Sequence, residues 1–288
     1  MKLALGTVQF GLNYGVANTS GRVPVEETGR ILRIARAAGI DTLDTAIAYG
    51  DSEARLGQAG VESWKVVSKL PGLPDNCAAV DEWVASSVNG SLERLELKKL
   101  YGLLLHRSED LIGPRGAELY AALQRLRESG KVAKVGISIY SPNELGAILP
   151  RYAIQLVQAP FNVFDRRLET SGLLDQLKAR GIEVHTRSTF LQGLLLLMPD
   201  ERPEKFRAWD ALWSRWHTWL EDNALTPLEG ALGFACRNPA VDRVLVGVDS
   251  ARHLHDIIEV VDRPIPSIPV AISTGDEALL NPSRWNAL

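Results

Sequence analysis

Short apolar runs alternate with longer amphipathic segments along most of the chain. Apolar runs of roughly four to eight residues are typical of buried strands, and apolar positions that recur every three or four residues predict helices. The runs that predict strands span residues 3–7, 40–44, 66–69, 101–106, 132–137, 154–157, 182–186 and 243–246. The chain is therefore predicted to contain eight strands, each followed by a connecting segment.

The connecting segments predict helices. The expected helices span about residues 26–38, 51–56, 80–95, 116–129, 167–180 and 251–260, and another begins at Ser141-Pro142. Thr226-Pro227-Leu228-Glu229 predicts one more helix start, because it combines a capping box with proline at the first helical position. Residues 8–15, which follow the first strand, are expected to form a glycine-containing loop.

Two segments depart from the alternation. An insertion at 191–203 precedes a helix in which Trp209, Trp213 and Trp216 share about one face, so this region covers about residues 191–222. We interpret that face as one that packs against the body of the protein, with a binding lid as the alternative. The tail from Asp262 onward, rich in proline at its start, is expected to be irregular.

Alternating strands and helices imply a parallel sheet with helical crossovers. Eight such units without a linker predict a single domain over residues 1–288, a closed (β/α)8 or TIM barrel, because that fold takes ~250 residues. An open doubly wound sheet is the alternative. It is less favoured, because the segment from Gly6 to Gly11 lacks the G-x-G-x-x-G spacing of a dinucleotide-binding loop.

Composition excludes several classes of function. The formal net charge of −3 gives no basic footprint for nucleic acid, and no run approaches the ~20 apolar residues that span a membrane. Cys77 and Cys236 are far apart and fit neither a disulfide framework nor a metal-ligand spacing. We therefore expect a cytoplasmic protein that binds neither nucleic acid nor a membrane. The sequence does not predict its oligomeric state.

The candidate chemistry lies at the ends of the strands. In a (β/α)8 barrel the active site forms at the carboxyl ends of the strands. The polar residues at or just beyond these ends are Asp44, Lys69, His106, Ser138, Gln158 and Arg187, with Tyr49 in the loop after the second strand. Polar residues are common where any strand leaves a core, but these types complement one another.

Four of these residues form a proton-handling set. Lys69 and Asp44 can pair in a partly buried site, and the ammonium would lower the pKa of the Tyr49 phenol by stabilising phenolate. A phenol of that kind can give its proton to a developing alkoxide near neutral pH. His106 could donate a second hydrogen bond to the same oxygen. The set predicts reduction of a carbonyl, with hydride supplied by a cofactor.

Other chemistries fit the sequence less well. The chain has no Gly-x-Ser-x-Gly elbow of a serine hydrolase. His253 and His255 lack the spacing of a zinc site, so no metal is predicted. A Schiff base on Lys69, as in barrel lyases, remains an alternative, although it gives Tyr49 no role.

The residues resemble the aldo-keto reductase family over most of the chain. The most specific part is Asp44-Thr45-Ala46-x-x-Tyr49-Gly50, followed by Ser68-Lys69 and His106, which match the family's catalytic Asp, Tyr, Lys and His. The resemblance implies a barrel, reversible carbonyl reduction and a nicotinamide cofactor, usually NADPH.

The resemblance also implies where the cofactor binds. Ser138 and Gln158 match positions that hold the nicotinamide carboxamide, and residues 247–250 lead into a helix N-terminus that suits a phosphate. The implied cofactor-binding set is Gly6, Thr7, Asp44, Ser138, Gln158, Arg187, Ser188, Gly193, Gly247, Asp249, Arg252, His253 and Asp256. Arg252 and His253 could bind the 2′-phosphate of NADPH or lie on a solvated face. Asp249 and Asp256 are negative in the same region, so NADH remains an alternative to NADPH.

Two positions depart from the family pattern. Ile139 stands where asparagine often follows the serine, and Arg187 stands where an aromatic residue stacks on the nicotinamide. A guanidinium can stack on a planar ring or bind an anion, and Phe190 could supply the missing ring. These departures motivate another alternative, a cofactor-binding regulatory subunit with little catalysis.

Substrate residues are expected in the loops that follow the strands. The candidates are Gln9, Phe10, Tyr14 and Tyr140, together with the insertion at 191–203. Polar and aromatic side chains suit a sugar or another hydroxylated carbonyl, and they would equally suit a structural loop. The sequence predicts a small-molecule carbonyl substrate without identifying it.

Overall fold

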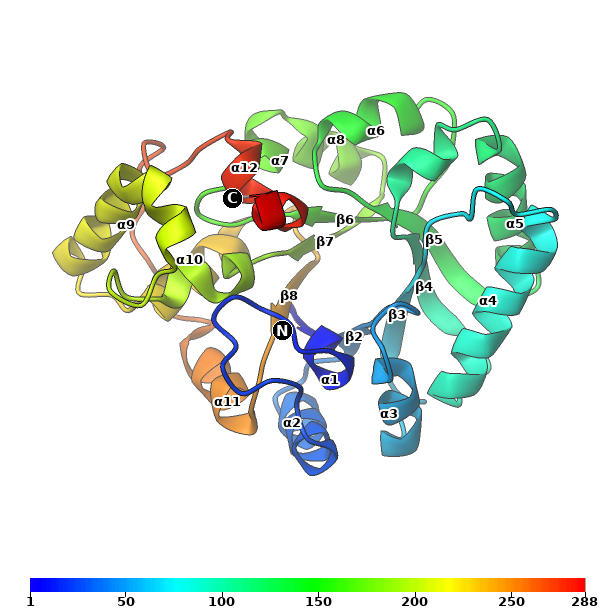
Figure 1. The fold of residues 1–288 in the computed structure, drawn as a ribbon, viewed down its shortest axis with the longest axis horizontal. Helices are drawn as coiled ribbons and strands as arrows, with labels where there is room; N and C mark the ends of the chain where they lie inside the picture. Colours follow the sequence, from blue (N-terminus) through cyan, green and yellow to red (C-terminus); the bar gives the residue numbers. More distant parts are fainter. Residues whose placement is uncertain (288) are drawn as a thin grey trace.

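Eight parallel strands close into a barrel at the centre of the molecule (Figure 1). The computed structural model describes residues 1–287. Each strand pairs with the next along the chain and β8 closes the ring against β1, so the predicted (β/α)8 barrel is confirmed. The strands are β1 (Leu3–Gly6), β2 (Thr42–Asp44), β3 (Lys65–Leu70), β4 (Leu100–Leu105), β5 (Val132–Ser138), β6 (Leu156–Pro160), β7 (Glu183–Arg187) and β8 (Arg243–Gly247).

Helices surround the strands, as Figure 1 shows. The α-helices are α1 (Val8–Gly11), α2 (Val25–Ala37), α3 (Ser52–Ala59), α4 (Val80–Leu95), α5 (Gly116–Glu128), α6 (Asn143–Ile148), α7 (Arg167–Thr170), α8 (Leu173–Ala179), α9 (Asp210–Asp222), α10 (Pro227–Arg237), α11 (Ala251–Val260) and α12 (Glu277–Leu280). The short 3-10 helices are η1 (Ser108–Leu111), η2 (Leu191–Leu196), η3 (Glu204–Trp209) and η4 (Pro282–Ala287). Helices α2, α4, α5 and α11 lie within one residue of their predicted bounds, because their apolar stripes and end signals are local features of the sequence.

A group of apolar side chains packs apart from the main core. Val67, Leu104 and Leu156 form a small buried apolar cluster that is separate from the larger core between the strands and the helices. A Cβ added to Gly102 would meet the side chains of Leu156 at 2.9 Å and Val67 at 3.3 Å, so a larger residue here would require these side chains to shift. Because side chains alternate along a strand, Lys69 points to the same side of β3 as Val67.

Two of the connecting segments differ from the prediction. Residues 8–11 form the short helix α1 rather than a loop. Phe10 is fully buried in the core, and this holds the backbone of the segment against the barrel. The single helix predicted at 167–180 is divided into α7 and α8. Gly172 separates them with a φ of 72°, a left-handed conformation that a continuing helix cannot contain.

The tail and the start of α6 also differ from the prediction. The tail contains α12 and η4, where an irregular segment was expected. Asp276 caps α12 by accepting a hydrogen bond from Ala278 N, and the buried Trp285 donates its indole N–H to Leu279 O at 3.0 Å. At α6, Pro142 is the N-cap and Asn143 the first helical residue, one position later than predicted.

The predicted capping box is present at the start of α10. Glu229 N donates to Thr226 Oγ1 at 3.3 Å, and Thr226 N donates to Glu229 Oε2 at 2.7 Å. These bonds satisfy backbone donors that the first turn of a helix leaves without partners. The sequence motif therefore fixes this helix end locally.

The tryptophan-rich helix packs against the body of the protein. Trp213 and Trp216 of α9 are buried, and their indole N–H groups donate to Phe206 O and Leu195 O, both at 3.2 Å. Trp216 also stacks on Trp219 with ring centroids 5.6 Å apart. Trp213 also packs on Phe164, which follows β6, with ring centroids 4.6 Å apart, so the predicted packing against the body of the protein is confirmed.

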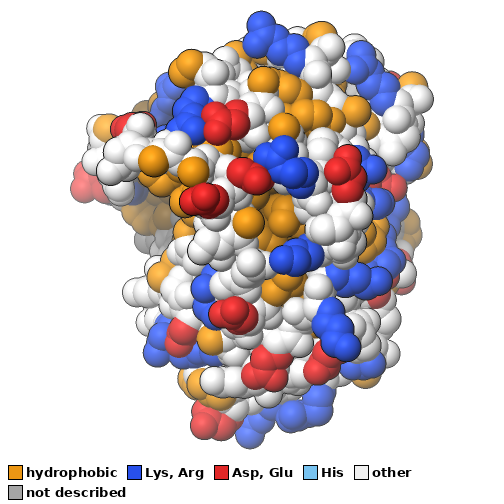
Figure 2. All heavy atoms as spheres, turned by 90° about the vertical axis from the view of Figure 1, so that its right-hand side faces the viewer, with side chains coloured by type: hydrophobic (Ala, Val, Ile, Leu, Met, Phe, Trp, Pro, Cys, Tyr) orange, Lys and Arg blue, Asp and Glu red, His pale blue; other side chains and the backbone are white. Residues whose placement is uncertain are grey.

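Charged and apolar side chains are interspersed on the face that carries α4 and α5 (Figure 2). One ion pair there joins Arg125 and Asp81 at 2.7 Å, with both side chains more than half exposed. Exposed pairs of this kind contribute roughly 0–1 kcal/mol, so stability depends mainly on the buried core. Across residues 1–287, each helix is too short or too polar to cross a membrane.

Candidate active site

A cavity of about 450 Å³ opens at the carboxyl ends of the strands, a size typical of a small-molecule site. Most of the predicted site residues line it. They are Gly6, Thr7, Gln9, Tyr14, Asp44, Tyr49, Gln158, Arg187, Ser188, Gly193, Gly247, Asp249, His253 and Asp256. Of the other predicted residues, Lys69, His106, Ser138 and Tyr140 lie directly behind or beside the lining, whereas Phe10 and Arg252 do not belong to it.

Asp44 and Lys69 form a buried ion pair at the base of the cavity. Asp44 ends β2 and Lys69 lies near the end of β3, which brings Lys69 Nζ to 2.5 Å from Asp44 Oδ1. The two side chains are 1% and 5% exposed. Lys69 Nζ also donates to Thr45 O at 2.9 Å and lies 3.4 Å from the Tyr49 hydroxyl. The structure thus places the phenol beside a shielded ammonium group.

His106 completes the set from the neighbouring strand. It directly follows β4, and its ring meets the Tyr49 ring edge to face, with centroids 6.0 Å apart and planes at 80°. Sequence reasoning therefore identified four residues that the fold brings together.

The charge states of Lys69 and His106 differ for physical reasons. Burial acts to lower the pKa of Lys69, but the Asp44 carboxylate and the Tyr49 phenol outweigh it and raise that pKa above its ordinary value. Burial, followed by the positive charges of Lys69 and Arg187, lowers the pKa of His106 to about 4. Near neutral pH the site holds an ammonium and a neutral imidazole.

Short-range hydrogen bonds fix the loop that carries Tyr49. Thr7 Oγ1 donates to Asp44 O at 3.0 Å, and Ser52 Oγ donates to Thr7 O at 2.9 Å, which ties β1, β2 and α3 together. A Cβ on Gly11 would lie 1.8 Å from Tyr49 O, so α1 can approach this loop only with glycine at that position. The position of the loop from Asp44 to Tyr49 therefore depends on contacts with the segment from Thr7 to Gly11, about 40 residues away in the sequence.

Glu53 anchors the same region, and the sequence analysis did not find it. Its side chain is fully buried on α3 and accepts hydrogen bonds from Ser68 Oγ and Ser91 Oγ, both at 2.6 Å. Its other oxygen pairs with Arg94 at 2.7 Å. Ser68 precedes Lys69 on β3, so Glu53 links the helix after Tyr49 to the strand that carries the lysine. The sequence feature that could have pointed to Glu53 is its position, an acidic residue four places after Tyr49.

Gln158 and Ser138 extend the hydrogen bonds of the Asp44–Lys69 ion pair to strands β6 and β5. Gln158 Nε2 donates to Asp44 Oδ2 at 2.7 Å, and Ser138 Oγ donates to Gln158 Oε1 at 3.3 Å. Both side chains are buried at the ends of β6 and β5. They form a row of amide and hydroxyl groups beside the Asp44–Lys69 ion pair.

The loop after β7 has an unusual backbone. Ser188, Leu191 and Gln192 have φ values of 59°, 48° and 55°, in the left-handed region that non-glycine residues rarely adopt. The buried Asn162 holds the turn by donating from Nδ2 to Ser188 O at 3.0 Å. Such a conformation persists only where its surroundings enforce it, and it is common beside ligand sites.

Polar atoms without partners lie on α1 and in the loop after β8. Among the described residues, Gln9 Oε1 and Asp249 Oδ1 are buried and accept no hydrogen bond. A Cβ on Gly247 would lie 2.6 Å from Gln9 Nε2, so the glycine leaves space for the Gln9 side chain. Burial raises the pKa of Asp249, and the nearby His253 only partly offsets that effect. Unpartnered buried acceptors cost free energy that a bound ligand can recover.

These features fit a dinucleotide cofactor. The cavity extends from Tyr49 to the N-terminus of α11, where Ser250 Oγ accepts from His253 N at 3.2 Å. A helix N-terminus favours anions, and at α11 the Glu27 carboxylate already accepts from Ala251 N at 2.7 Å. The unpartnered Gln9 and Asp249 acceptors can receive hydroxyl or amide hydrogens. The polar row at Gln158 suits a carboxamide at the other end.

Two predicted binding residues lie elsewhere. Phe10 is fully buried in the core, because α1 turns its ring inward, and we no longer assign it to substrate. Arg252 lies on the exposed side of α11, away from the cavity, while His253 of the same helix lines it. By contrast, the Tyr14 hydroxyl accepts from Gln192 Nε2 at 3.0 Å at the cavity rim.

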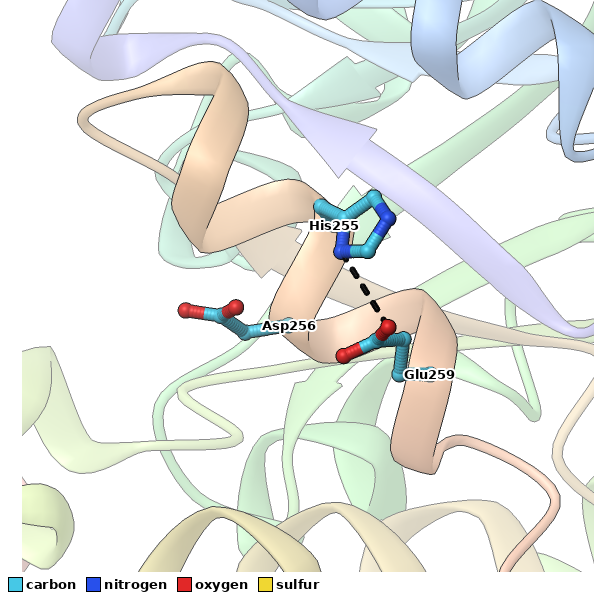
Figure 3. Close-up of side chains that lie close together, drawn as sticks. All are labelled: His255, Asp256 and Glu259. Atoms are coloured by element: carbon cyan, nitrogen blue, oxygen red, sulfur yellow. Dashed lines mark ion pairs between the residues drawn. The ribbon is translucent and has the colours of Figure 1, made fainter.

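A separate group of polar side chains lies on α11 (Figure 3). Possible ligand atoms of His255, Asp256 and Glu259 lie within 4.8 Å of one another, and His255 Nδ1 is 3.5 Å from Glu259 Oε1. His255 and Glu259 are more than 60% exposed and lie one helical turn apart. Such pairs are ordinary on solvated helix faces, so we assign this group no metal.

Comparison with known proteins identifies the family. The model of the Aldo/keto reductase family matches residues 2–272, so the chain belongs to this family. It is 30% identical over 198 residues to the L-glyceraldehyde 3-phosphate reductase of Escherichia coli K12, a match that covers 66% of this chain and 51% of the relative. The chain thus spans about half the length of that curated relative.

Further similarities support the same family and fold. An aldo-keto reductase of Mycobacterium sp. (strain KMS) is 29% identical over 187 residues, which cover 62% of this chain and 64% of the relative. The solved structure of an aldo-keto reductase from Bacillus halodurans superposes with a TM-score of 0.73 at 20% identity, covering 92% of this chain and 88% of that one. At that identity the structural match shows the barrel fold alone.

Proposed function

We propose that this protein is an NAD(P)H-dependent oxidoreductase that reduces an aldehyde or ketone to an alcohol, with Tyr49 as the proton donor. The observation that carries the proposal is the Tyr49 hydroxyl at the cavity wall, 3.4 Å from the buried ammonium of Lys69. Its family membership supports the same reaction class. The L-glyceraldehyde 3-phosphate reductase to which it is similar acts, by its name, on an aldehyde.

In this proposal each residue has a defined part. The cofactor supplies hydride to the carbonyl carbon. Tyr49 gives its phenolic proton to the carbonyl oxygen, and the Lys69 ammonium stabilises the phenolate that results. Neutral His106 donates an N–H hydrogen bond to the same oxygen as negative charge develops there. Asp44 keeps Lys69 in place and charged.

The cofactor would lie along the row of polar groups. Gln158 and Ser138 would hold the nicotinamide carboxamide, and the Ser250–His253 helix start would hold phosphate. Gly6, Thr7, Ser188, Gly193 and Gly247 would form the remaining wall. His253 supports NADPH, the form expected from the sequence, whereas the carboxylates of Asp249 and Asp256 on the same wall oppose a 2′-phosphate.

The lysine-centred alternative is less compatible with the geometry. A Schiff base requires a neutral amine to attack the carbonyl. Lys69 is buried against Asp44 and its pKa is raised, so the amine stays protonated near neutral pH. A purely regulatory subunit would have no need for a phenol, an ammonium and a neutral imidazole in contact at one cavity wall.

Replacement of Tyr49 tests the proposal. Tyr49→Phe should lower kcat for a panel of aldehydes and ketones by about 100- to 10,000-fold, because it removes the proton donor. Its affinity for NADPH and NADH, followed by tryptophan fluorescence, should match that of wild type. Tyr152→Phe is the matched control, since Tyr152 packs against Tyr120 away from the cavity. Unchanged turnover in Tyr49→Phe would remove Tyr49 from the mechanism.

A further inference from the structure

Arg187 makes an unusual set of contacts for a half-buried arginine. Its Nη2 donates to Ile139 O at 2.9 Å, and its Nη1 donates to Ser188 Oγ at 3.1 Å. Its guanidinium carbon lies 4.6 Å from the centre of the Tyr140 ring. All of these partners are uncharged, and they hold the guanidinium plane in one orientation.

No carboxylate of residues 1–287 lies within ion-pair distance of Arg187. Two other shielded arginines do have such a partner: Arg167 pairs with Asp165 at 2.7 Å, and Arg55 pairs with Asp51 at 3.1 Å. The buried Arg166 has none, but its guanidinium donates three hydrogen bonds to backbone carbonyls. A guanidinium has five N–H donors, of which Arg187 uses two here. The remaining donors and the charge are free for a ligand.

The position of Arg187 connects this charge to the reacting carbonyl. Arg187 lines the same cavity as Tyr49 and Tyr14. Its charge is close enough to influence His106 and Tyr14. Of the other charges near Tyr49, those on Lys69 and Asp44 offset each other in their ion pair, and Asp249 and Asp256 line the cavity near β8 and α11. Arg187 therefore supplies an unpaired positive charge to the part of the cavity near Tyr49.

We propose that Arg187 binds an acidic group of the substrate, so that the enzyme acts on carbonyl compounds that carry a carboxylate or a phosphate. This inference rests on the proposed carbonyl reduction. A planar guanidinium can donate two parallel hydrogen bonds to either anion. Stacking on Tyr140 fixes the plane in advance, which lowers the entropy lost on binding. A diphosphate of the cofactor is the other anion that could occupy the same donors.

Matched substrates test the proposal. The probe pair is 4-carboxybenzaldehyde and 4-methylbenzaldehyde, which have similar shapes and differ in charge. Wild type should prefer the acid by about 10- to 100-fold in kcat/KM, the effect of a hydrogen-bonded charge. Arg187→Met should abolish that preference, measured as the ratio of the two kcat/KM values, because the acid then loses the donors that bind its charge. Arg187→Lys should keep part of the preference for the acid, because an ammonium group retains the positive charge but lacks the planar pair of donors of a guanidinium.

Arg151→Met is the control for loss of one positive charge, since Arg151 is exposed and outside the cavity. It should retain the wild-type preference. If Arg187→Met instead lowers kcat/KM equally for both aldehydes, so that the preference is retained, Arg187 does not bind the acidic group and the proposal is overturned. Equal use of the two aldehydes by wild type overturns it as well.

A binding measurement separates this proposal from the proposed reaction. Calorimetry with the cofactor-loaded protein compares 4-(hydroxymethyl)benzoate, which NADPH cannot reduce, with 4-methylbenzyl alcohol. Saturable binding of the acid to wild type and its loss in Arg187→Met support the anion site even if no carbonyl is turned over, in which case the reductase proposal alone fails. Absence of that binding in wild type overturns the anion site.

Discussion

The two ends of the cavity differ in how their polar groups are paired. At the β2–β3 end, Lys69 contacts Asp44, Thr45 O and Tyr49, and Gln158 satisfies the second carboxylate oxygen of Asp44. At the β7–β8 end, Asp249 Oδ1 has no partner within residues 1–287, and Arg187 has no carboxylate of those residues beside it. One end is complete by itself, and the other has unused hydrogen-bonding capacity.

This difference indicates which part of the site is fixed in advance and which part depends on a ligand. Groups that stabilise a developing charge act best when they need no rearrangement during the reaction. Groups that recognise a ligand must leave donors and acceptors free for it, at a cost to the stability of the free protein of roughly 1–3 kcal/mol per buried unsatisfied group. The β2–β3 end fits the first role and the β7–β8 end fits the second.

The largest effect is expected where the pairing is tightest. Lys69→Met removes the partner of a buried carboxylate, so the free energy of unfolding should fall by about 3–5 kcal/mol. Chemical denaturation measures this change. The matched control is Lys65→Met, because Lys65 lies on the same strand and pairs with Asp41 at 2.8 Å, but both side chains are more than 40% exposed. That control should cost less than about 1 kcal/mol.

A double variant shows whether the unpaired charge causes the loss. Asp44→Asn combined with Lys69→Met should recover much of the stability, because no buried charge remains. If the double variant is as unstable as Lys69→Met alone, the cost comes from altered packing, and the contrast between the two ends would not rest on charge pairing.

A smaller effect is expected from His106 as the pH falls. The pKa of His106 is about 4 in the folded protein and near 6.5 when unfolded, so between these values the unfolded chain binds more protons. Stability should therefore decrease as the pH is lowered from 6.5 to 4, by roughly 2–3 kcal/mol. NMR titration of the imidazole should give the low pKa directly. The pH dependence should weaken in His106→Asn but persist in His255→Gln, whose imidazole is exposed; the same profile in His106→Asn as in wild type would contradict this origin.

The smallest effect, a change in cofactor preference, is expected at the β7–β8 end of the cavity. Asp249→Asn removes a half-buried negative charge from the cavity wall, so affinity for NADPH relative to NADH should rise by about 5- to 10-fold. Fluorescence titration with each cofactor gives the ratio. Asp262→Asn, exposed just beyond α11, should leave it unchanged. A constant ratio in Asp249→Asn would place the 2′ position of the cofactor away from this carboxylate.

Much of the fold could be predicted because its signals are local. The apolar runs place the strands, and the capping box at Thr226 places the start of α10. The break at Gly172 was missed, since glycine is tolerated in some helices and only its left-handed φ ended this one. Helix α1 was also missed, because four residues carry no periodic signal and the burial of Phe10 decides their conformation.

The sequence by itself predicted the barrel and the residues that it brings together, because Asp44, Lys69 and His106 each stand at the end of an apolar run and strand ends meet in a barrel. Only the tertiary structure decided how polar groups pair. The bonds from Glu53 to Ser91 and from Arg187 to Ile139 join residues 38 and 48 positions apart. Hydrogen bonds and charges act over a few ångströms in space, and sequence spacing does not reveal which distant atoms come that close.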